Sequence, residues 1–187
     1  GYGYFPVKEK SMKYIFFIFL SVSTVFGQKT SDSFKWQDGN TYKSSVEYTF
    51  DDIPDNGSYS CIMSDIKGDI DIIGHPGSGT HLIIERVIQA MSNKNAINML
   101  EKNQIQVFHI ETDKTVEIKR LGHRYQNRIE SRFRIHLPFN TNITIESAGG
   151  DIRIRKIRGQ IEVRTRGGDI ELKQLSGITL SLIHISE

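Results

Sequence analysis

The sequence predicts an all-β protein that folds as a single-stranded β-solenoid similar to a β-helix, with one short helix near residues 92–103. Three observations predict this fold. Apolar residues recur every nine positions, glycines recur in step with them, and the motif Gly-Asp-Ile occurs at 150–152 and again, at twice that period, at 168–170. Self-similarity at a short fixed period is typical of solenoids, so we expect nine-residue strand–turn units, two in each coil.

The nine-residue period covers residues 142–177. In each Ile-x-Ile unit the two apolar side chains point to the same face of a strand, and the following glycine permits a tight turn. One such strand cannot bury its apolar pair alone, so equivalent strands should stack. A meander of hairpins is the alternative, but it does not require the same residue at four successive positions of a column. The columns are Ile143, Ile152, Ile161 and Ile170; Ile145, Ile154, Val163 and Leu172; and Gly150, Gly159, Gly168 and Gly177.

The same motif occurs once earlier, as Gly-Asp-Ile at 68–70. Counting back nine positions from its isoleucine reaches Cys61, and Met63 follows two positions later. Both are apolar, so Cys61 is predicted to be a small core residue and not a reactive thiol. The residues predicted to carry the structural repeat are Gly68, Asp69, Ile70, Gly150, Asp151, Ile152, Gly159, Ile161, Gly168, Asp169 and Ile170.

The segment 1–27 is predicted to lie outside the mature fold. Lys13 and the apolar run after it are typical of a signal peptide, and Val25 and Gly27 occupy the −3 and −1 positions of a cleavage site. The run is too short to span a bilayer, and a buried core strand or helix is the alternative. We therefore expect an upstream translated leader at 1–11, a signal peptide at 12–27, and an exported protein that is periplasmic, cell-surface or secreted.

The middle of the chain is assigned in order. Residues 28–56 are expected to form a linker or a strand extension, and residues 57–177 the solenoid domain, truncated at its C-terminus. Ser92 is predicted to cap the helix, because Ala96 and later apolar residues recur at helical spacing. Strands outside the repeat are predicted at 81–87, 104–111, 115–119 and 133–137.

Residues 178–187 are predicted to be a non-native tail. Continuing the repeat demands apolar residues at positions 179 and 181, where the sequence has Thr179 and Ser181. The apolar alternation there is one residue out of phase, which would turn every side chain to the wrong face. Residues 181–187 also resemble a translated sequencing adapter. A membrane tether is expected in the missing C-terminal part.

Composition and charge exclude several classes of protein. The 187 residues contain one cysteine, which excludes a disulfide framework and a multi-thiolate metal site. The formal net charge of +2 comes from the segment 1–27, which holds Lys8, Lys10, Lys13 and Glu9, so the rest of the chain is formally neutral. Whole-protein electrostatics therefore predicts no particular partner, and nucleic acid is not expected for an exported chain.

One further pattern is a likeness to a known family. Three features carry it: the motif Gly-Asp-Ile-Asp-Ile at 68–72, the short helix before a strand pair, and His-Leu-Pro-Phe-Asn at 136–140 leading into Ile-Thr-Ile at 143–145. With the tandem Gly-Asp-Ile units, residues 57–177 resemble the bacterial putative-adhesin family, a secreted or membrane-tethered β-solenoid domain of unknown function related to auto-transporter adhesin head domains. The resemblance implies a fold and an adhesin-like role, and it carries over no catalytic residue.

Few residues point to chemistry. The histidines form no zinc-binding spacing, the Gly-rich loop at 74–80 lacks the pattern of a phosphate-binding loop, and no metal or cofactor is expected. Asp151 and Asp169 should stack one coil apart, with Asp69 in an equivalent position. Such a ladder is either a shared calcium or sugar site or a set of carboxylates that cap the glycine turns through their own backbone.

Basic residues are the remaining candidates for binding. They could meet acidic glycans or anionic lipid headgroups, and a solvated loop and strand face is the alternative. One set is expected to point outward from the repeat and the other to form a cluster around a polar loop, next to Lys119. The residues are Arg153, Arg155, Arg164 and Arg166 in the first set, and Arg120, Arg124, Arg128, Arg132 and Arg134 in the second.

These patterns favour a non-enzymatic, exported β-solenoid that serves as an adhesin-like or cell-envelope interaction module. Its expected partner is a cell-surface glycan or an envelope protein. The first alternative is a polysaccharide-acting β-helix enzyme that uses Asp151 and Asp169 as acid and base. The second alternative is an envelope stress-sensing partner of a membrane protein.

Overall fold

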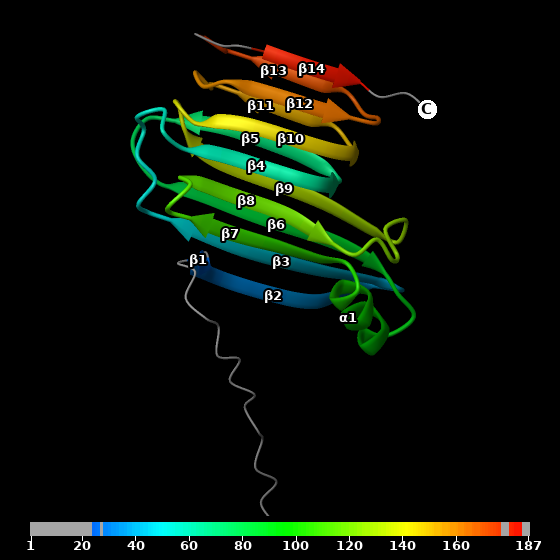
Figure 1. Cartoon of the computed structure of the whole chain (residues 1–187). Coiled ribbons are helices and arrows are strands. Elements are labelled where there is room, and N and C mark those ends of the chain that lie inside the picture. Colours follow the sequence, from blue (N-terminus) through cyan, green and yellow to red (C-terminus); the bar gives the residue numbers. More distant parts are fainter. Residues whose placement is uncertain (1–23, 27, 177–179, 185–187) are drawn as a thin grey trace, which may run out of the picture.

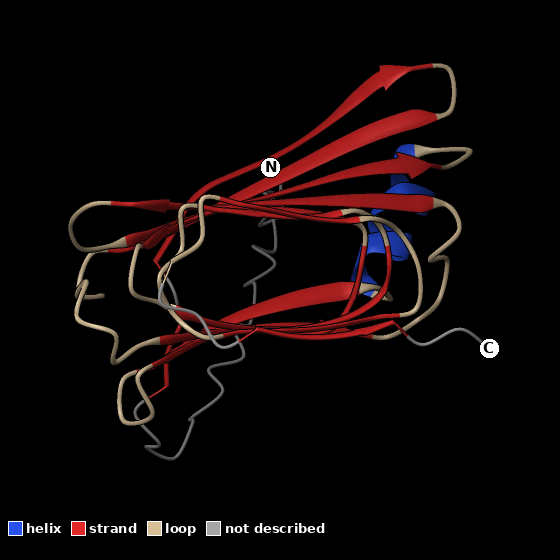
Figure 2. Ribbon diagram, turned by 90° about the horizontal axis from the view of Figure 1, so that it is seen from above, coloured by secondary structure: helices blue, strands red, loops and turns tan. Residues whose placement is uncertain are grey.

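The computed structural model describes residues 24–26, 28–176 and 180–184, and within them two seven-stranded sheets pack face to face (Figures 1 and 2). Sheet A lies in front in Figure 1 and sheet B behind it. In order across sheet A the strands are β1 (Thr24–Phe26), β7 (Gln104–Ile110), β8 (Thr115–Leu121), β4 (Ser60–Lys67), β10 (Asn142–Gly149), β12 (Ile161–Thr165) and β14 (Leu180–His184). Across sheet B they are β13 (Ile170–Lys173), β11 (Ile152–Arg155), β5 (Asp69–His75), β9 (Ile129–Pro138), β6 (Thr80–Gln89), β3 (Thr41–Phe50) and β2 (Gln28–Asp38).

The all-β prediction is confirmed, but the prediction of a single-stranded β-solenoid is wrong. Both sheets are mixed. Antiparallel pairs join β1 to β7, β7 to β8, β2 to β3, β3 to β6 and β6 to β9, and parallel pairs join the other described neighbours. The physical reason is that residues 28–56 and 80–138 lack the nine-residue repeat, and the strands of these segments pair with one another in antiparallel directions.

The repeat itself sets the strand register in the parallel part of the molecule. Ile143 pairs with Ile161 across β10 and β12, and Ile152 pairs with Ile170 across β11 and β13, so in these two pairs the parallel neighbour lies two repeat units further along the chain. Successive nine-residue units therefore alternate between sheet A and sheet B. The spacing grows by one position at β14, where Leu180 pairs with Ile161.

The apolar columns of the repeat fill the space between the sheets. Ile145, Ile152, Ile154 and Val163 have no exposed surface. Cys61 is also fully buried, which confirms its prediction as a core residue, and burial raises the pKa of its thiol to about 12. These side chains and the inward residues of β5, β6, β8 and β9 form one continuous apolar core.

The glycines of the Gly-Asp-Ile motifs lie where three turns stack on one another. Gly150 has a φ of +109°, and a Cβ on it would lie 2.3 Å from the carbonyl oxygen of Gly68. The same construction on Gly168 would lie 2.2 Å from the carbonyl oxygen of Gly150. Glycine is therefore required at Gly150 by the backbone conformation and by the close approach of the turn beside it.

The helix α1 (Asn93–Glu101) lies between the sheets on the side where they splay apart (Figure 2). The Ser92 hydroxyl accepts a hydrogen bond from the backbone N–H of Asn95 at 3.2 Å, which confirms the predicted cap. Ala96 and Met99 pack in a second apolar cluster with residues of β3, β6 and β9. The helix thus covers core that sheet A does not reach.

A polar row separates the two apolar clusters within sheet B. Arg86 pairs in register with Ser44 on one side and Ser131 on the other. Its Nη1 donates to the backbone oxygen of Asn103 at 3.1 Å, and burial lowers the pKa of the guanidinium. The interior is therefore not uniformly apolar.

Several predicted boundaries fall partly outside the described residues. The leader 1–11 and residues 12–23 and 27 of the predicted signal peptide lie outside them, whereas Thr24–Phe26 form β1. The predicted linker includes the β2–β3 hairpin. The division of the chain into leader, signal peptide, domain and tail stays a prediction. Among the described residues, no helix has the length and apolar character needed to cross a membrane.

Candidate functional site: the charged face of sheet B

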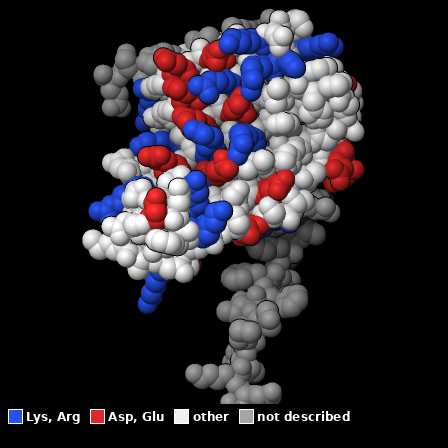
Figure 3. All heavy atoms as spheres, turned by 180° about the vertical axis from the view of Figure 1, so that it is seen from behind, with Lys and Arg blue, Asp and Glu red and all other residues white. Residues whose placement is uncertain are grey.

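The outer face of sheet B carries acidic and basic side chains in alternation. Figure 3, which views the molecule from behind relative to Figure 1, shows both signs interleaved across this surface. We define the charged face as the outward residues Glu171 and Lys173 of β13, Arg153 and Arg155 of β11, Asp69 and Asp71 of β5, Arg132 and Arg134 of β9, and Glu85 of β6.

Strand register creates this alternation. Arg153 lies opposite Glu171 on one side and Asp71 on the other. In the next row, Arg132 lies between Asp69 and Glu85. Because side chains directly opposite each other on one sheet face are close neighbours, each of these cations has an anion within reach across the strands.

The ion pairs hold the guanidinium groups in defined positions. Nη2 of Arg155 contacts both carboxylate oxygens of Asp71 at 2.8 and 3.0 Å. The hydrogen bond from Lys173 and the nearby positive charges lower the pKa of Glu171. Solvent-exposed pairs of this kind contribute little to stability, so they do not explain the fold. The other pairs on the face are Arg134–Glu85 at 2.6 Å, Arg153–Glu171 at 3.2 Å, Arg132–Asp69 at 3.5 Å and Lys173–Glu171.

Two hollows lie along the charged face. One has a volume of about 260 Å³ and is lined by residues of β5, β6, β9 and β11, including Asp71, Arg134 and Arg153. The other has a volume of about 380 Å³ and extends across β3 to β2. They share three lining residues, Asp69, Glu85 and Arg132, so they form one shallow depression across six neighbouring strands.

The larger hollow differs from the rest of the face in its charges. Lys35 of β2 lies directly opposite Lys43 of β3, and both side chains are exposed. Neither lysine has a hydrogen-bond or ion-pair partner among the described residues. Like charges directly opposite each other on a sheet destabilise the pair, so this arrangement is not explained by strand pairing. We call this site the lysine hollow.

Histidines occupy one margin of the same face. His81 pairs with Glu47, and this hydrogen bond lowers the pKa of the Glu47 carboxyl. The rings of His81 and His136 are 6.1 Å apart and nearly perpendicular. Partial burial, followed by the charges of His81 and His75, lowers the pKa of His136.

The predicted aspartate ladder is present, and its carboxylates bind backbone amides of the neighbouring turn. Oδ1 of Asp69 accepts from the backbone N–H of Asp151 at 3.2 Å, and Oδ1 of Asp151 accepts from the backbone N–H of Asp169 at 3.1 Å. Asn142 and Gln160 repeat this arrangement in the other sheet at 2.9 Å. Each carboxylate therefore caps the adjacent turn of the stack and not its own turn. This geometry gives no support to the predicted acid and base pair.

The structure divides the predicted basic cluster. Arg132 and Arg134 lie on the charged face, Lys119 lies on sheet A, and Arg124 and Arg128 lie in the loop between β8 and β9. Arg120 is not a surface residue, because only 6% of it is exposed.

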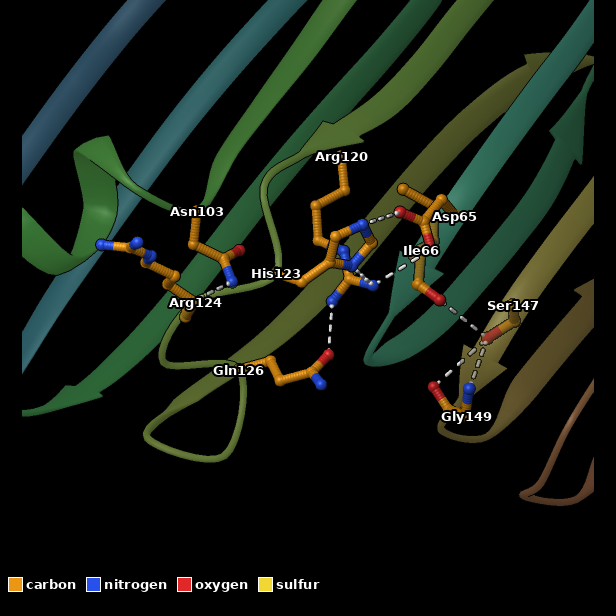
Figure 4. Close-up of polar contacts among 9 residues, drawn as sticks. All are labelled: Asp65, Ile66, Asn103, Arg120, His123, Arg124, Gln126, Ser147 and Gly149. Carbon is orange, nitrogen blue, oxygen red and sulfur yellow. Dashed lines mark hydrogen bonds and ion pairs between the residues drawn. The ribbon is translucent and has the colours of Figure 1, made fainter.

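Arg120 is instead the buried member of a polar cluster at the end of β8, whose other members reach the surface (Figure 4). Its Nη2 donates to Asp65 at 3.1 Å and its Nη1 to Gln126 at 3.2 Å. His123 contacts both Arg120 and the other carboxylate oxygen of Asp65. These contacts tie the β8–β9 loop to β4, which is a structural role.

The four arginines of the repeat also separate. Arg153 and Arg155 lie on sheet B, whereas Arg164 and Arg166 belong to the β12 region of sheet A, where Arg164 pairs with Glu162 at 2.8 Å. Successive nine-residue units face opposite sides of the molecule, so these residues cannot form one patch. Within the described chain, no group of three or more His, Cys, Asp or Glu side chains is placed to hold a metal ion.

The two lysines of the lysine hollow, Lys35 and Lys43, were absent from the sequence-based candidates, as were Asp71, Glu85 and Lys173 of the charged face. The signal that could have found the two lysines is the Asp-Gly pair at 38–39 between two runs of alternating apolar and polar residues, which is typical of a hairpin. A hairpin with this turn brings the two lysines opposite each other.

Comparisons with known proteins find solved structures of low sequence identity. No family model matches the chain, and no curated protein matches it. A structure of a putative cell adhesion protein from Clostridium sporogenes is 15% identical, with a TM-score of 0.48, and the match covers 73% of this chain and 66% of that one.

Two structures from Parabacteroides are also similar. A putative lipid binding protein from Parabacteroides distasonis is 13% identical, with 78% and 63% of the two chains covered and a TM-score of 0.36. A putative adhesin from Parabacteroides merdae is 9% identical, with 74% and 55% covered and a TM-score of 0.31. The chain thus spans less than two thirds of the length of each of these three proteins.

Proposed function

We propose that this chain is a non-enzymatic, exported, adhesin-like interaction module of the cell envelope, and that the charged face binds its partner. The observation that carries the proposal is the concentration of ion-paired side chains on five neighbouring strands of sheet B. The signal peptide predicted at 12–27 and the sequence resemblance to the putative-adhesin family support the export and the adhesin-like role.

The charged face has the properties of a recognition surface. Its charges lie on hydrogen-bonded strands, so a partner would meet groups that are already positioned and would order little on binding. Alternating charges favour partners that carry a complementary pattern of charges and hydrogen-bonding groups. A cell-surface glycan or an envelope protein is the partner proposed here.

A pair of matched variants tests the proposal. Arg134→Gln with Glu85→Gln removes one ion pair from the charged face, and Glu162→Gln with Arg164→Gln removes one from sheet A, with no change of net charge in either case. We expect the first variant to lower binding to an envelope fraction or a glycan array by about tenfold, which corresponds to about 1.4 kcal/mol, and the second to leave it unchanged.

Two results would count against the proposal. Equal losses in the two variants would mean that the charged face has no special part in binding. Turnover of a polysaccharide in a hydrolase and lyase screen, lost when Asp151 and Asp169 are both changed to Asn, would replace the proposal with an enzymatic function.

A further inference from the structure

The lysine hollow combines two kinds of unpaired charge. Lys35 and Lys43 stand side by side at its β2–β3 end, and Glu130 of β9 lines the same hollow without an ion-pair partner in the described part of the chain. Val87 of β6 lies opposite Lys43 on one side and Glu130 on the other. The backbones of Lys43 and Glu130 are therefore two strand spacings apart, about 10 Å, and the two side chains form no ion pair.

Small outward residues line the lysine hollow on β2 and β3 beside the two lysines. Ser33 and Ser45 face each other across β2 and β3, and Ser45 is followed in register by Glu85 of β6. Hydroxyl groups and carboxylates are thus placed within one hollow of about 380 Å³. This volume lies in the range of small-molecule and cofactor sites, roughly 300–1,000 Å³.

We infer that the lysine hollow binds an acidic saccharide, with a carboxylate of the sugar on Lys35 and Lys43. This inference rests on the proposed function and names the ligand class of the same face. The two lysines lack an anion, and a uronate carboxylate supplies one. The sugar hydroxyls donate to the carboxylates of Glu130 and Glu85, and the serine hydroxyls bond the remaining oxygens.

The acidic groups of the hollow decide between a saccharide and an acidic peptide. Glu85, Glu130 and Asp69 all line the hollow, and a glutamate peptide offers their carboxylates no hydroxyl donor. The same three groups attract the hydroxyl donors of a sugar. The depression also crosses six strands from β2 to β11, or about 24 Å at about 4.8 Å per strand, so an oligosaccharide of several sugar units fits along it.

The test uses the chain without its predicted signal peptide and a tetragalacturonate as the probe. The fully methyl-esterified tetragalacturonate has the same sugar ring but no charge, and a glutamate oligomer of equal charge represents the peptide class. We expect the acid saccharide to bind at least tenfold more tightly than either of the others in calorimetric titration. The affinity should fall as salt concentration rises.

Lysine variants locate the site. Lys35→Gln with Lys43→Gln should weaken tetragalacturonate binding about tenfold, and Lys35→Arg with Lys43→Arg should retain it because the charge remains. Lys94→Gln with Lys119→Gln removes the same charge from α1 and sheet A and should leave binding unchanged. Thermal unfolding of each variant shows whether the fold is kept.

The outcomes separate this inference from the proposed function. Equal binding of acid and ester, preference for the glutamate oligomer, or full binding by the Lys35→Gln and Lys43→Gln variant would overturn the inference. If the Arg134 and Glu85 variant still loses envelope binding in any of these cases, the proposed function stands without it. If neither the Lys35→Gln and Lys43→Gln variant nor the Arg134→Gln and Glu85→Gln variant loses binding, both the inference and the proposed function are wrong.

Discussion

The two halves of the molecule join their strands by different physical means. In the parallel half, around β10 to β13, short strands pair with the strand two repeat units away, and stacked turns approach so closely that only glycine fits. In the antiparallel half, around β2, β3, β6 and β9, longer strands pair through non-repeated side chains. This difference shows that the sequence repeat predicts strand register only where the repeated strands pair in parallel.

The largest effect is expected from Gly150→Ala in the parallel half. A Cβ there would overlap the carbonyl oxygen of Gly68, and its φ of +109° is strained for alanine. We expect a loss of about 3 kcal/mol or more in the free energy of unfolding, measured in urea. Gly167→Ala is the matched control, because no atom lies within 4 Å of its Cβ position. Similar losses in the two variants would show that the turns do not limit the approach of the strands.

A smaller effect is expected from Gly39→Ala at the tip of the β2–β3 hairpin. Gly39 has a φ of +46°, but nothing lies within 4 Å of its Cβ position, so only backbone conformation opposes alanine. We expect a loss of about 1 kcal/mol in the same urea measurement. Gly39→Asn should recover most of it, since asparagine tolerates this conformation. If Gly39→Ala costs as much as Gly150→Ala, the contrast between the two halves fails.

The smallest effect is a pH dependence at the margin of the charged face. Partial burial and neighbouring histidines lower the pKa of His136, so the folded state favours its neutral form. The stability that neutral His136 gives the folded state is fully present above the pKa of an unfolded-state histidine, near 6.5. It is lost as the pH falls toward the lower pKa of His136 in the folded state. The urea midpoint of the wild type should therefore fall between about pH 7.5 and 5.5, and His136→Gln should show a weaker fall. The lowered pKa of Glu47 acts only below about pH 4.5, outside this window. An unchanged slope in the variant would contradict the prediction.

The parallel half was the more predictable from sequence because its side chains repeat. The column containing Ile152 and Ile161 lies in the core, and the helix begins at its predicted cap, Ser92. The solenoid prediction was wrong because the repeat carries no information on how the non-repeated segments fold. Pairing of β6 with both β3 and β9 depends on contacts far apart in the chain, which local periodicity does not encode.

The candidate site was predicted only in part for the same reason. Arg132, Arg134, Arg153 and Arg155 lie outside the core, but their acidic partners come from strands that the sequence does not show to be adjacent. Arg120 looked like its neighbours in sequence and is buried against β4 instead. Which charges meet is decided by register across sheet B, and that register requires the fold.

The aspartate ladder has a consequence for how such a chain can change in length during evolution. Each carboxylate secures the amide of the following Gly-Asp-Ile turn, and each glycine leaves room for the next. A duplicated pair of repeat units therefore brings its own capping carboxylate and glycine, and it can be accommodated beside the existing strands without new interactions elsewhere. The antiparallel half offers no such unit, so growth by duplication is confined to one end of the molecule, and the lysine hollow stays unaltered at the other.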